Sequence, residues 1–309
     1  MGKVLVVGDV HIADNPPGWR TADYRDHILE KLVWVGKCAR ENGAGVIVFT
    51  GDLFHRKSGV SHGLVSNLLD VFGRYPITPI VVPGNHDVKF DRVDDLEKTA
   101  LGVLHKSNAV TCFGQNSMTA HYGKNIALVG YRANMDAEYL SKVVSNKNEH
   151  IHLAVVHYGF SKRPMPYHTI VTSECEPPRN VSMIVAGHIH DDQGEWMWGD
   201  VRVVSYGSIS RGSWTTDNRT RTPRVALVDL STNTVESINV PCHPASEVFR
   251  TEEAEEKAAK LLGMEEFVSS LDGSRVAMLS VGEVSNTIEA SGVAKPVADR
   301  AIEAVEQVW

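Results

Sequence analysis

Five apolar, β-branched runs along the chain are each followed at once by a short block rich in Asp, His and Asn. Since ligands bind at the carboxyl ends of strands in an open α/β sheet, these blocks should converge at one edge. Asp, His and Asn in such numbers at one edge constrain both the fold and its chemistry. The blocks are Gly8-Asp9-Val10-His11, Gly51-Asp52-Leu53-Phe54-His55, Gly84-Asn85-His86-Asp87, His157-Tyr158-Gly159 and Gly187-His188-Ile189-His190.

The residue types and their spacing within these blocks indicate metal binding. Asp9 and His11 are two residues apart, as are His188 and His190. In extended backbone, residues two apart point to the same side. Carboxylate, imidazole and amide groups without a thiolate suit ions such as Mn²⁺, Fe or Zn²⁺. Each block alone is a weak signal, because Gly-Asp and His-x-His occur often in proteins that bind no metal. All five at predicted strand ends form a strong one.

The order of apolar runs and helical stretches predicts an α/β fold. Early strands alternate with amphipathic helices, which favours a sheet with parallel parts. After residue 125 the strands follow one another through turns, which indicates a second sheet. We therefore expect two mixed β-sheets in a sandwich flanked by helices. The expected strands are 3–7, 46–49, 79–82, 126–130, 153–156, 183–186, 201–205, 225–229 and 235–240, with helices at 25–42 and 63–75 and a proline-rich loop near the site at 161–180.

Composition and charge bear on whether the protein binds nucleic acid and on the compartment in which it works. The formal net charge of −7 has the wrong sign for a protein that grips nucleic acid with its whole surface, although a local basic path remains compatible with it. The four cysteines are scattered, the N-terminus enters a strand at once, and no apolar run is long enough to cross a bilayer. We expect a cytoplasmic protein with free thiols and no membrane association.

The character of the sequence changes near residue 243. We expect a catalytic domain at 1–243 and a small C-terminal α+β module at 244–309. Within this module the pattern predicts a helix at 252–262, a strand at 275–281 and a helix at 297–308. The module is interpreted as a capping or partner-binding element.

The ordered series D-x-H, G-D, G-N-H-D, H and G-H-x-H resembles the calcineurin-like metallophosphoesterase superfamily over roughly residues 3 to 230. That family has two mixed sheets flanked by helices and two divalent metal ions, here expected to be Mn²⁺, with Fe, Zn²⁺ or Mg²⁺ as alternatives. The resemblance implies that one ion is held by Asp9, His11 and His190, the other by Asn85, His157 and His188, and that Asp52 bridges them.

The same resemblance implies roles in catalysis. Two such ions activate a water molecule for in-line attack and clamp the phosphate. His86 would stand just outside the metals and donate a proton to the leaving oxygen or stabilise its charge. Asp87 would orient His86 or its loop; a simple turn carboxylate is an equally good explanation of Asp87.

The second block distinguishes branches of the superfamily. Protein phosphatases carry GDxxDRG, whereas this chain has Gly51-Asp52-Leu53-Phe54-His55, which resembles the SbcD-type repair nucleases. In that branch the extra histidine positions the scissile phosphate, so His55 would take this role; an ordinary loop histidine is the alternative. The strand ending in Tyr206-Gly207-Ser208 resembles that branch as well.

These features predict a Mn²⁺-dependent DNA exonuclease or endonuclease. A phosphodiesterase for cyclic nucleotides or other small diesters is the alternative. A non-catalytic scaffold is disfavoured because every metal-ligand position and His86 are present. Candidate DNA contacts are Arg56, Lys57, Lys89 and Arg211, for which solvated loop charges are an equal explanation.

Two protein partners follow from the resemblance. An SMC-like ATPase of the SbcC type is expected, although the chain is shorter than bacterial SbcD proteins and leaves little room for a helical pair that would bind it. A homodimer could form through an apolar stripe on the helix at 63–75. Core packing is the more common use of such a stripe. The stripe is Leu64, Val65, Leu68, Leu69 and Phe72.

Overall fold

The computed structural model describes residues 2–88, 93–112, 119–122, 125–144 and 150–257. The chain divides into two compact units, Met1–Arg250 and Thr251–Trp309. In the second unit, residues 251–257 are helical and overlap the helix expected at 252–262. The strand expected at 275–281 and the helix expected at 297–308 lie outside the described residues. Of the helices that are described, none is long and apolar enough to cross a membrane.

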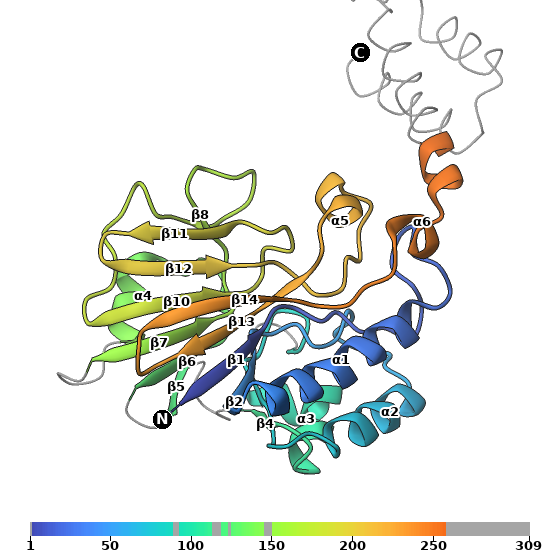
Figure 1. The fold of residues 1–309 in the computed structure, drawn as a ribbon, viewed down its shortest axis with the longest axis horizontal. Coiled ribbons are helices and arrows are strands. Elements are labelled where there is room, and N and C mark those ends of the chain that lie inside the picture. The colour runs from blue at the N-terminus through green and yellow to red at the C-terminus, as the bar shows by residue number, and fades with distance from the viewer. Residues whose placement is uncertain (1, 89–92, 113–118, 123–124, 145–149, 258–309) are drawn as a thin grey trace, which may run out of the picture. The chain divides into compact units, whose positions relative to one another are not determined.

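The first sheet has six strands in the order β14-β13-β1-β2-β3-β4. Strands β1 to β4 run parallel to one another, while β13 is antiparallel to both β1 and β14. Helices α1, α2 and α3 lie on one side of this sheet (Figure 1). The elements are β1 (Lys3–Val7), α1 (Tyr24–Glu41), β2 (Ala44–Phe49), α2 (His62–Phe72), β3 (Ile80–Val81), a 3-10 helix (Val93–Lys98), α3 (Ala100–Lys106), β4 (Thr111–Cys112), β13 (Arg224–Asp229) and β14 (Thr234–Asn239).

The second sheet also has six strands, in the order β11-β12-β10-β7-β6-β5. Its four central strands are parallel, and the two edge strands β11 and β5 are antiparallel. Helix α4 packs on its outer face, and β8 and β9 form a separate short ribbon. The elements are β5 (Thr119–Tyr122), β6 (Ile126–Val129), α4 (Ala137–Val144), β7 (Ile151–Val156), β8 (Phe160–Ser161), β9 (Ile170–Val171), β10 (Val181–Ala186), β11 (Gly194–Trp198), β12 (Val201–Ser205), α5 (Thr216–Thr220) and α6 (Ala245–Val248).

Three apolar layers hold these elements together. The middle layer lies between the sheets, where Val4 and Val48 of the first sheet pack in one cluster with Val155 of the second. The outer layers join α1, α2 and α3 to the first sheet and α4 to the second. Most strands are therefore buried on both faces and read as continuous apolar runs rather than alternating ones. The predicted sandwich of two mixed sheets flanked by helices is confirmed.

The apolar stripe on α2 is mostly used inside this unit. Leu64, Leu68 and Phe72 are buried in the layer between the helices and the first sheet, and Val65 and Leu69 pack against that layer. This arrangement favours the core-packing interpretation of the stripe. A homodimer stays a prediction.

Helix α1 buries a lysine against the sheet, and this predicts a pH-dependent stability. Lys31 is 5% exposed, and its Nζ donates to the carbonyl of Ile209 at 2.5 Å. Burial, with nearby Arg211 adding to it, lowers the pKa of Lys31 from 10.5 to about 7. Between these pH values the unfolded chain binds more protons than the folded one, so stability rises as the pH increases from about 7 to 10.5.

The gain in the free energy of unfolding is expected to be on the order of 5 kcal/mol. Urea unfolding of the wild type and of Lys31→Met across this pH range would measure it. The difference between the two proteins isolates Lys31 from tyrosines and cysteines that titrate in the same range. Parallel pH dependences for both proteins would contradict the prediction.

Candidate metal centre

The loops that follow β1, β2, β3, β7 and β10 meet at the carboxyl edges of the two sheets. Backbone hydrogen bonds join the first two of these loops, because the amide nitrogens of Val10 and His11 donate to the carbonyl of Asp52 at 3.2 and 2.9 Å. The loops after β7 and β10 are joined to the first two loops by hydrogen bonds that involve side chains. The imidazole of His157 contacts the carbonyl of Thr50 at 2.9 Å, and the amide of His188 donates to Asp9 at 2.8 Å. The structure thus brings all five blocks together.

Asp9, His11, Asp52 and His190 form a first cluster. One ligand-type atom from each lies within 4.8 Å of the others. The Nε2 atom of His11 is 2.8 Å from Nε2 of His190 and 3.6 Å from Oδ2 of Asp52. The Nε2 atom of His190 is also 3.9 Å from Oδ2 of Asp9. The donor atoms of four residues from three loops therefore face one small volume.

Asp52, Asn85, His157 and His188 form a second cluster beside the first. Asp52, His157 and His188 again place ligand-type atoms within 4.8 Å of one another. The Oδ1 atom of Asn85 lies 3.2 Å from Nε2 of His157 and 3.1 Å from Nδ1 of His188. Asp52 belongs to both clusters, through Oδ2 at 3.5 Å from His157 and 3.6 Å from His11.

The second cluster has the chemistry of a cation site. A carbonyl oxygen can only accept, so Nδ1 of His157 carries the proton that it donates to Thr50. Nε2 of His157 faces the oxygens of Asn85 and Asp52, at 3.2 and 3.5 Å, so a positive charge is needed here, supplied by a proton on Nε2 or by a metal ion that replaces that proton. Ions with bonds of about 2.0–2.2 Å place adjacent ligand atoms roughly 3–3.6 Å apart. The separations of 3.1 to 3.5 Å within the second cluster fit this requirement.

Burial and charge shift the pKa values in both clusters. Burial raises the pKa of Asp9, whereas for Asp52 the neighbouring His157 and His11 outweigh burial and lower the pKa far below its usual range. Burial lowers the pKa of His188 to about 4 and that of His11 well below 6.5, so both imidazoles are neutral at pH 7. For His157, burial is outweighed by Asp52 and Asp9, and the pKa rises to about 9. Two buried carboxylates beside neutral imidazoles favour binding of a divalent cation.

The backbone around the clusters is strained and closely packed. His11, Asp52 and His188 have φ values of 50°, 48° and 80°, a region that costs an L-residue on the order of 1 kcal/mol. A Cβ atom at Gly84 would lie 2.2 Å from Oδ1 of Asp52, and one at Gly187 would lie 2.5 Å from Oδ1 of Asp9. Glycine is therefore required at both positions for the carboxylates to keep their places.

His86, His55 and Asp87 lie beside the first cluster. The rings of His86 and His55 are centred 5.0 and 5.7 Å from the ring of His11. The amide of His86 donates to Asp52 at 2.7 Å, and its Nδ1 contacts the carbonyl of His55 at 2.6 Å. The buried carboxylate of Asp87 instead accepts from the amides of Phe54 and Gly84, at 3.2 and 3.0 Å. Asp87 thus links the loops of the second and third blocks.

The predicted basic residues lie in different places. Arg56 and Lys57 are exposed and line an open groove of about 390 Å³ that also contacts His86. Lys89 lies outside the described residues. Arg211 is 3% exposed, and its Nη2 donates to the carbonyl of His243 at 2.5 Å. This burial contradicts the surface position that a DNA contact requires, so Arg211 is not such a contact.

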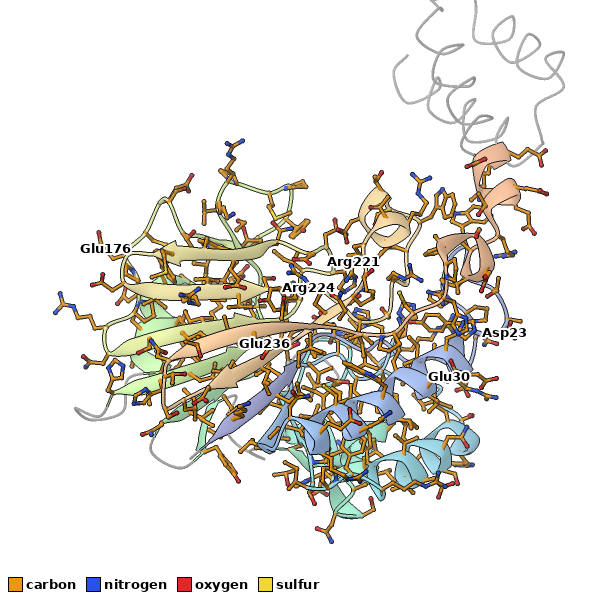
Figure 2. The ribbon with its side chains drawn as sticks, viewed as in Figure 1. Asp23, Glu30, Glu176, Arg221, Arg224 and Glu236 are labelled. Atoms are coloured by element: carbon orange, nitrogen blue, oxygen red, sulfur yellow. The ribbon has the colours of Figure 1, made fainter. Side chains whose placement is uncertain are left out.

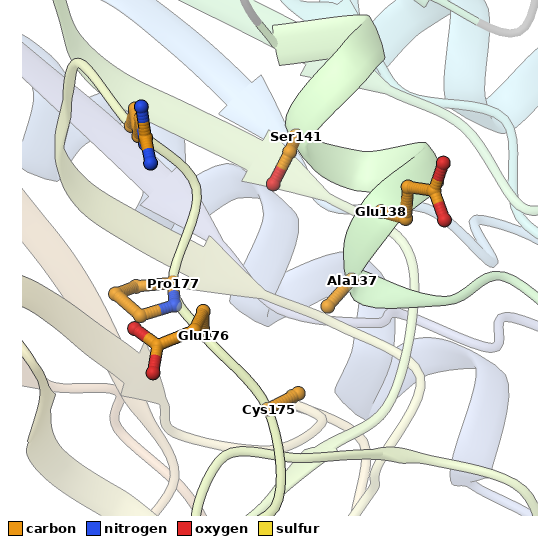
Figure 3. Close-up of a pocket in the computed structure, with 7 residues that line it drawn as sticks. Ala137, Glu138, Ser141, Cys175, Glu176 and Pro177 are labelled. Carbon is orange, nitrogen blue, oxygen red and sulfur yellow. The ribbon is translucent and has the colours of Figure 1, made fainter.

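A second hollow, of about 440 Å³, lies between α4 and the loop around Cys175 (Figure 3). None of the predicted site residues lines it.

Two residues near the clusters are absent from the sequence-based set. Thr50 donates its hydroxyl to Oδ1 of Asp9 at 2.9 Å, and its carbonyl holds His157. The ring of Tyr131, in the loop after β6, is centred 5.4 Å from that of His188 and 6.1 Å from that of His157. The position of Thr50, between a strand and the Gly51-Asp52 pair, is a signal in the sequence, whereas Tyr131 stands in no metal-binding block.

A family model covers the part of the chain that contains the five blocks. The family model described as calcineurin-like phosphoesterase matches residues 2–192. No curated protein matches the chain. The chain is similar to the solved structure of TT1561 of Thermus thermophilus, with 16% identity, a TM-score of 0.49, and coverage of 78% of this chain and 99% of the other.

Two further solved structures are similar at lower identity. A dimetal phosphatase from Danio rerio has 12% identity and a TM-score of 0.49, with 77% of this chain and 99% of the other covered. A structure described as a novel archaeal phosphodiesterase has 12% identity and a TM-score of 0.40, with the same coverage. The family model spans well over half of this chain and includes all five blocks, with Asp and His residues placed to bind divalent metal. The chain belongs to the calcineurin-like phosphoesterase family of metal-dependent hydrolases.

Proposed function

We propose that this protein is a two-metal phosphodiesterase that hydrolyses nucleic-acid phosphodiesters, as a Mn²⁺-dependent DNA nuclease of the SbcD type. In this proposal Asp9, His11 and His190 hold one ion, Asn85, His157 and His188 hold the other, and Asp52 contributes to both. The observation that most supports a nucleic-acid substrate is the open groove beside His86, which is lined by exposed Arg56 and Lys57.

The groove suits an extended anionic substrate. Lys98 also lines it, so the groove carries three cationic side chains. Glu97 lines it as well, but its carboxylate is paired with Lys106 at 2.9 Å. Lys and Arg along a groove neutralise successive phosphates of a polynucleotide, even when the average charge of the protein is negative. An enclosed pocket would instead favour a small diester.

The position of His55 supports the same branch. Its ring is centred 6.0 Å from that of His86 and lies nearly parallel to it, at 26°. Burial, with His86 adding to it, lowers the pKa of His55, so at neutral pH the side chain is an uncharged hydrogen-bonding group. A phosphate held at the first cluster would lie next to both imidazoles. His55 is therefore proposed to position the scissile phosphate.

The proposed mechanism assigns a task to each side chain. Bound divalent ions would supply Lewis acidity, which stabilises charge on phosphate oxygens and favours deprotonation of a water molecule. His86 donates Nδ1–H to the carbonyl of His55, which directs its Nε2 toward other partners. In its doubly protonated form His86 donates the Nε2 proton to the leaving oxygen and becomes a neutral imidazole. Asp87 keeps the loop that carries His86 against the loop of the second block.

The test is to incubate the purified protein and Mn²⁺ with end-labelled linear duplex and single-stranded DNA, a cyclic nucleotide and a small aryl diester. Loss of label that stops with a chelator would support the nuclease and show its polarity. Turnover of the small diesters with DNA left intact would overturn the proposal in favour of a small-molecule phosphodiesterase. Repeating the assay with Mg²⁺, Zn²⁺ and Fe²⁺ tests the choice of metal.

Removing the two exposed cations of the groove is expected to weaken DNA binding. The double variant Arg56→Ala, Lys57→Ala should reduce the slope of log affinity against log salt concentration by about 2, since each phosphate contact contributes about 0.9. Turnover of a small aryl diester should be unchanged, because neither side chain belongs to the clusters. Lys37→Ala, Arg40→Ala on the exposed face of α1 is the matched control. An unchanged salt slope would contradict a role for the groove.

A further inference from the structure

The main-chain carbonyls of three first-cluster residues are all held by one layer of neighbouring groups. The carbonyl of Asp9 accepts from the amide of Ile209 at 2.9 Å. The carbonyl of His190 accepts from the amide of Ser208, also at 2.9 Å. The carbonyl of His11 accepts from the hydroxyl of Tyr24 at 2.8 Å. The layer therefore consists of the segment after β12 and the start of α1.

The hydrogen bond from the Tyr24 hydroxyl is made to His11, whose backbone is strained and whose imidazole Nδ1 lacks a partner in the described part of the chain. His11 has a φ of 50°, and strained conformations persist only where the surroundings fix them. Its Nδ1 is buried and has no hydrogen-bond partner among the described residues, whereas His157 is fixed through Nδ1 by Thr50. The orientation of the His11 imidazole thus depends on its backbone, and the Tyr24 hydroxyl holds the carbonyl of that backbone.

Two buried basic side chains hold the segment after β12 in place. Lys31 donates to the carbonyl of Ile209, and Arg20 donates to those of Ser210 and Arg211 at 3.0 and 2.9 Å. The guanidinium of Arg20 also lies 5.0 Å from the centre of the Tyr24 ring. These contacts fix both the segment after β12 and the ring of Tyr24.

Arg221 completes the layer on the side of His190. Its Nη2 donates to the carbonyl of Ser208 at 2.6 Å and to that of His190 at 3.2 Å. Figure 2 labels Arg221 next to α5, directly after the C-terminal end of that helix. Its own charge is balanced by Asp217 at 2.6 Å. A cationic donor strengthens a hydrogen bond to a carbonyl, so this contact is worth more than a neutral one.

We propose that Tyr24 is a positioning residue for the metal ion of the first cluster, acting through its hydrogen bond to the carbonyl of His11. Losing this bond frees the strained backbone of His11 and lets its imidazole leave the geometry that a metal ion requires. Partners of this kind around metal ligands typically contribute roughly 10-fold to 100-fold in metal affinity. The inference rests on the metal site and does not require that the substrate be a nucleic acid.

The test is calorimetric titration of the chelator-treated protein with Mn²⁺, with no substrate present. Tyr24→Phe removes the hydroxyl alone and is expected to weaken one of two binding events by roughly 10-fold to 100-fold, leaving the other unchanged. Tyr75→Phe is the matched control, because the buried hydroxyl of Tyr75 also donates to a backbone carbonyl, that of Leu32 at 2.6 Å, but contacts no cluster residue. Both variants should lose similar stability in the presence of chelator, because each loses one hydrogen bond to a backbone carbonyl.

Wild-type affinity for both ions in Tyr24→Phe would overturn the proposal, as would an equal loss in Tyr75→Phe. Arg221→Met, which removes a donor to the carbonyl of His190, should weaken the same binding event. If Tyr24→Phe does not fold, the metal affinity of Arg221→Met still tests the inference, and wild-type affinity in that variant would count against it. Normal metal binding with no DNA cleavage in the wild type would refute the proposed nuclease and leave this inference intact.

Discussion

Replacing Asp52 by asparagine is expected to abolish tight binding of both metal ions and, with it, all hydrolysis. Asp52 is the residue shared by the two clusters, and its carboxylate is 1% exposed. The imidazoles of His157 and His11 lie 3.5 and 3.6 Å from its Oδ2. Removing one charge from such a buried arrangement costs about 3–5 kcal/mol, which corresponds to a loss of roughly 100-fold to 1,000-fold or more in affinity for each ion.

Asparagine is the sharpest substitution at this position because it preserves shape. Its Oδ1 can still accept the hydrogen bond that the amide of His86 donates at 2.7 Å, so the loop of the third block keeps its anchor. Metal content per chain, measured after dialysis against Mn²⁺, is the readout. Asp229→Asn, at an exposed carboxylate beside Ser231, is the matched control and should retain wild-type metal content. Two ions retained per chain in Asp52→Asn would refute the shared role.

The parts of the fold that the sequence predicted are those governed by local patterns. The strand at 3–7 was predicted to the residue, and helix α1 to within one residue at each end, because Gly43 follows that helix and its apolar positions repeat at helical spacing. The convergence of the five blocks was predictable for a similar reason, since parallel strands present their carboxyl ends at a common edge.

Elements with weak local patterns escaped prediction. Strands β4, β8 and β9 are two residues long and take their conformation from neighbouring strands. Strand β11 alternates partly buried and exposed residues at the edge of its sheet, with Met197 55% exposed, and contains no β-branched residue. Helix α4 is short and begins only after the turn at 132–136. In each case tertiary contacts override the local sequence.

Long-range contacts explain the remaining differences at the site. Arg211 follows soon after the strand that ends at Tyr206-Gly207-Ser208, which made it a candidate DNA contact. Its hydrogen bond to His243 and the close packing around it keep the side chain buried. Tyr24 and His11 meet across a loop whose sequence carries no sign of the pairing. The ATPase partner and the homodimer concern surfaces outside the site and stay predictions. Metal-ligand types can therefore be recognised from sequence, whereas the groups that orient them depend on the packed structure.

Replacing His86 by alanine is expected to reduce hydrolysis of DNA by roughly 100-fold to 10,000-fold while both metal ions remain bound. The side chain of His86 lies beside the first cluster but belongs to neither, so its removal leaves the proposed ligands in place. Its backbone amide, which donates to Asp52, is retained in the variant. His150→Ala, at an exposed histidine bonded to Ser182 before β7, is the matched control and should keep full activity and metal content.

The leaving group separates proton donation by His86 from simple binding of phosphate. A deoxyribose oxygen is a poor leaving group and needs a proton in the transition state, whereas an aryl oxide leaves as a stable anion. If His86 donates from Nε2, His86→Ala should lose most of its activity on DNA but little on an aryl diester. Equal losses on both substrates would show that His86 only holds the phosphate, because binding acts on either substrate alike. The hydrogen bond from Nδ1 to the carbonyl of His55 makes the first outcome the expected one, since it fixes the ring with Nε2 available for proton transfer.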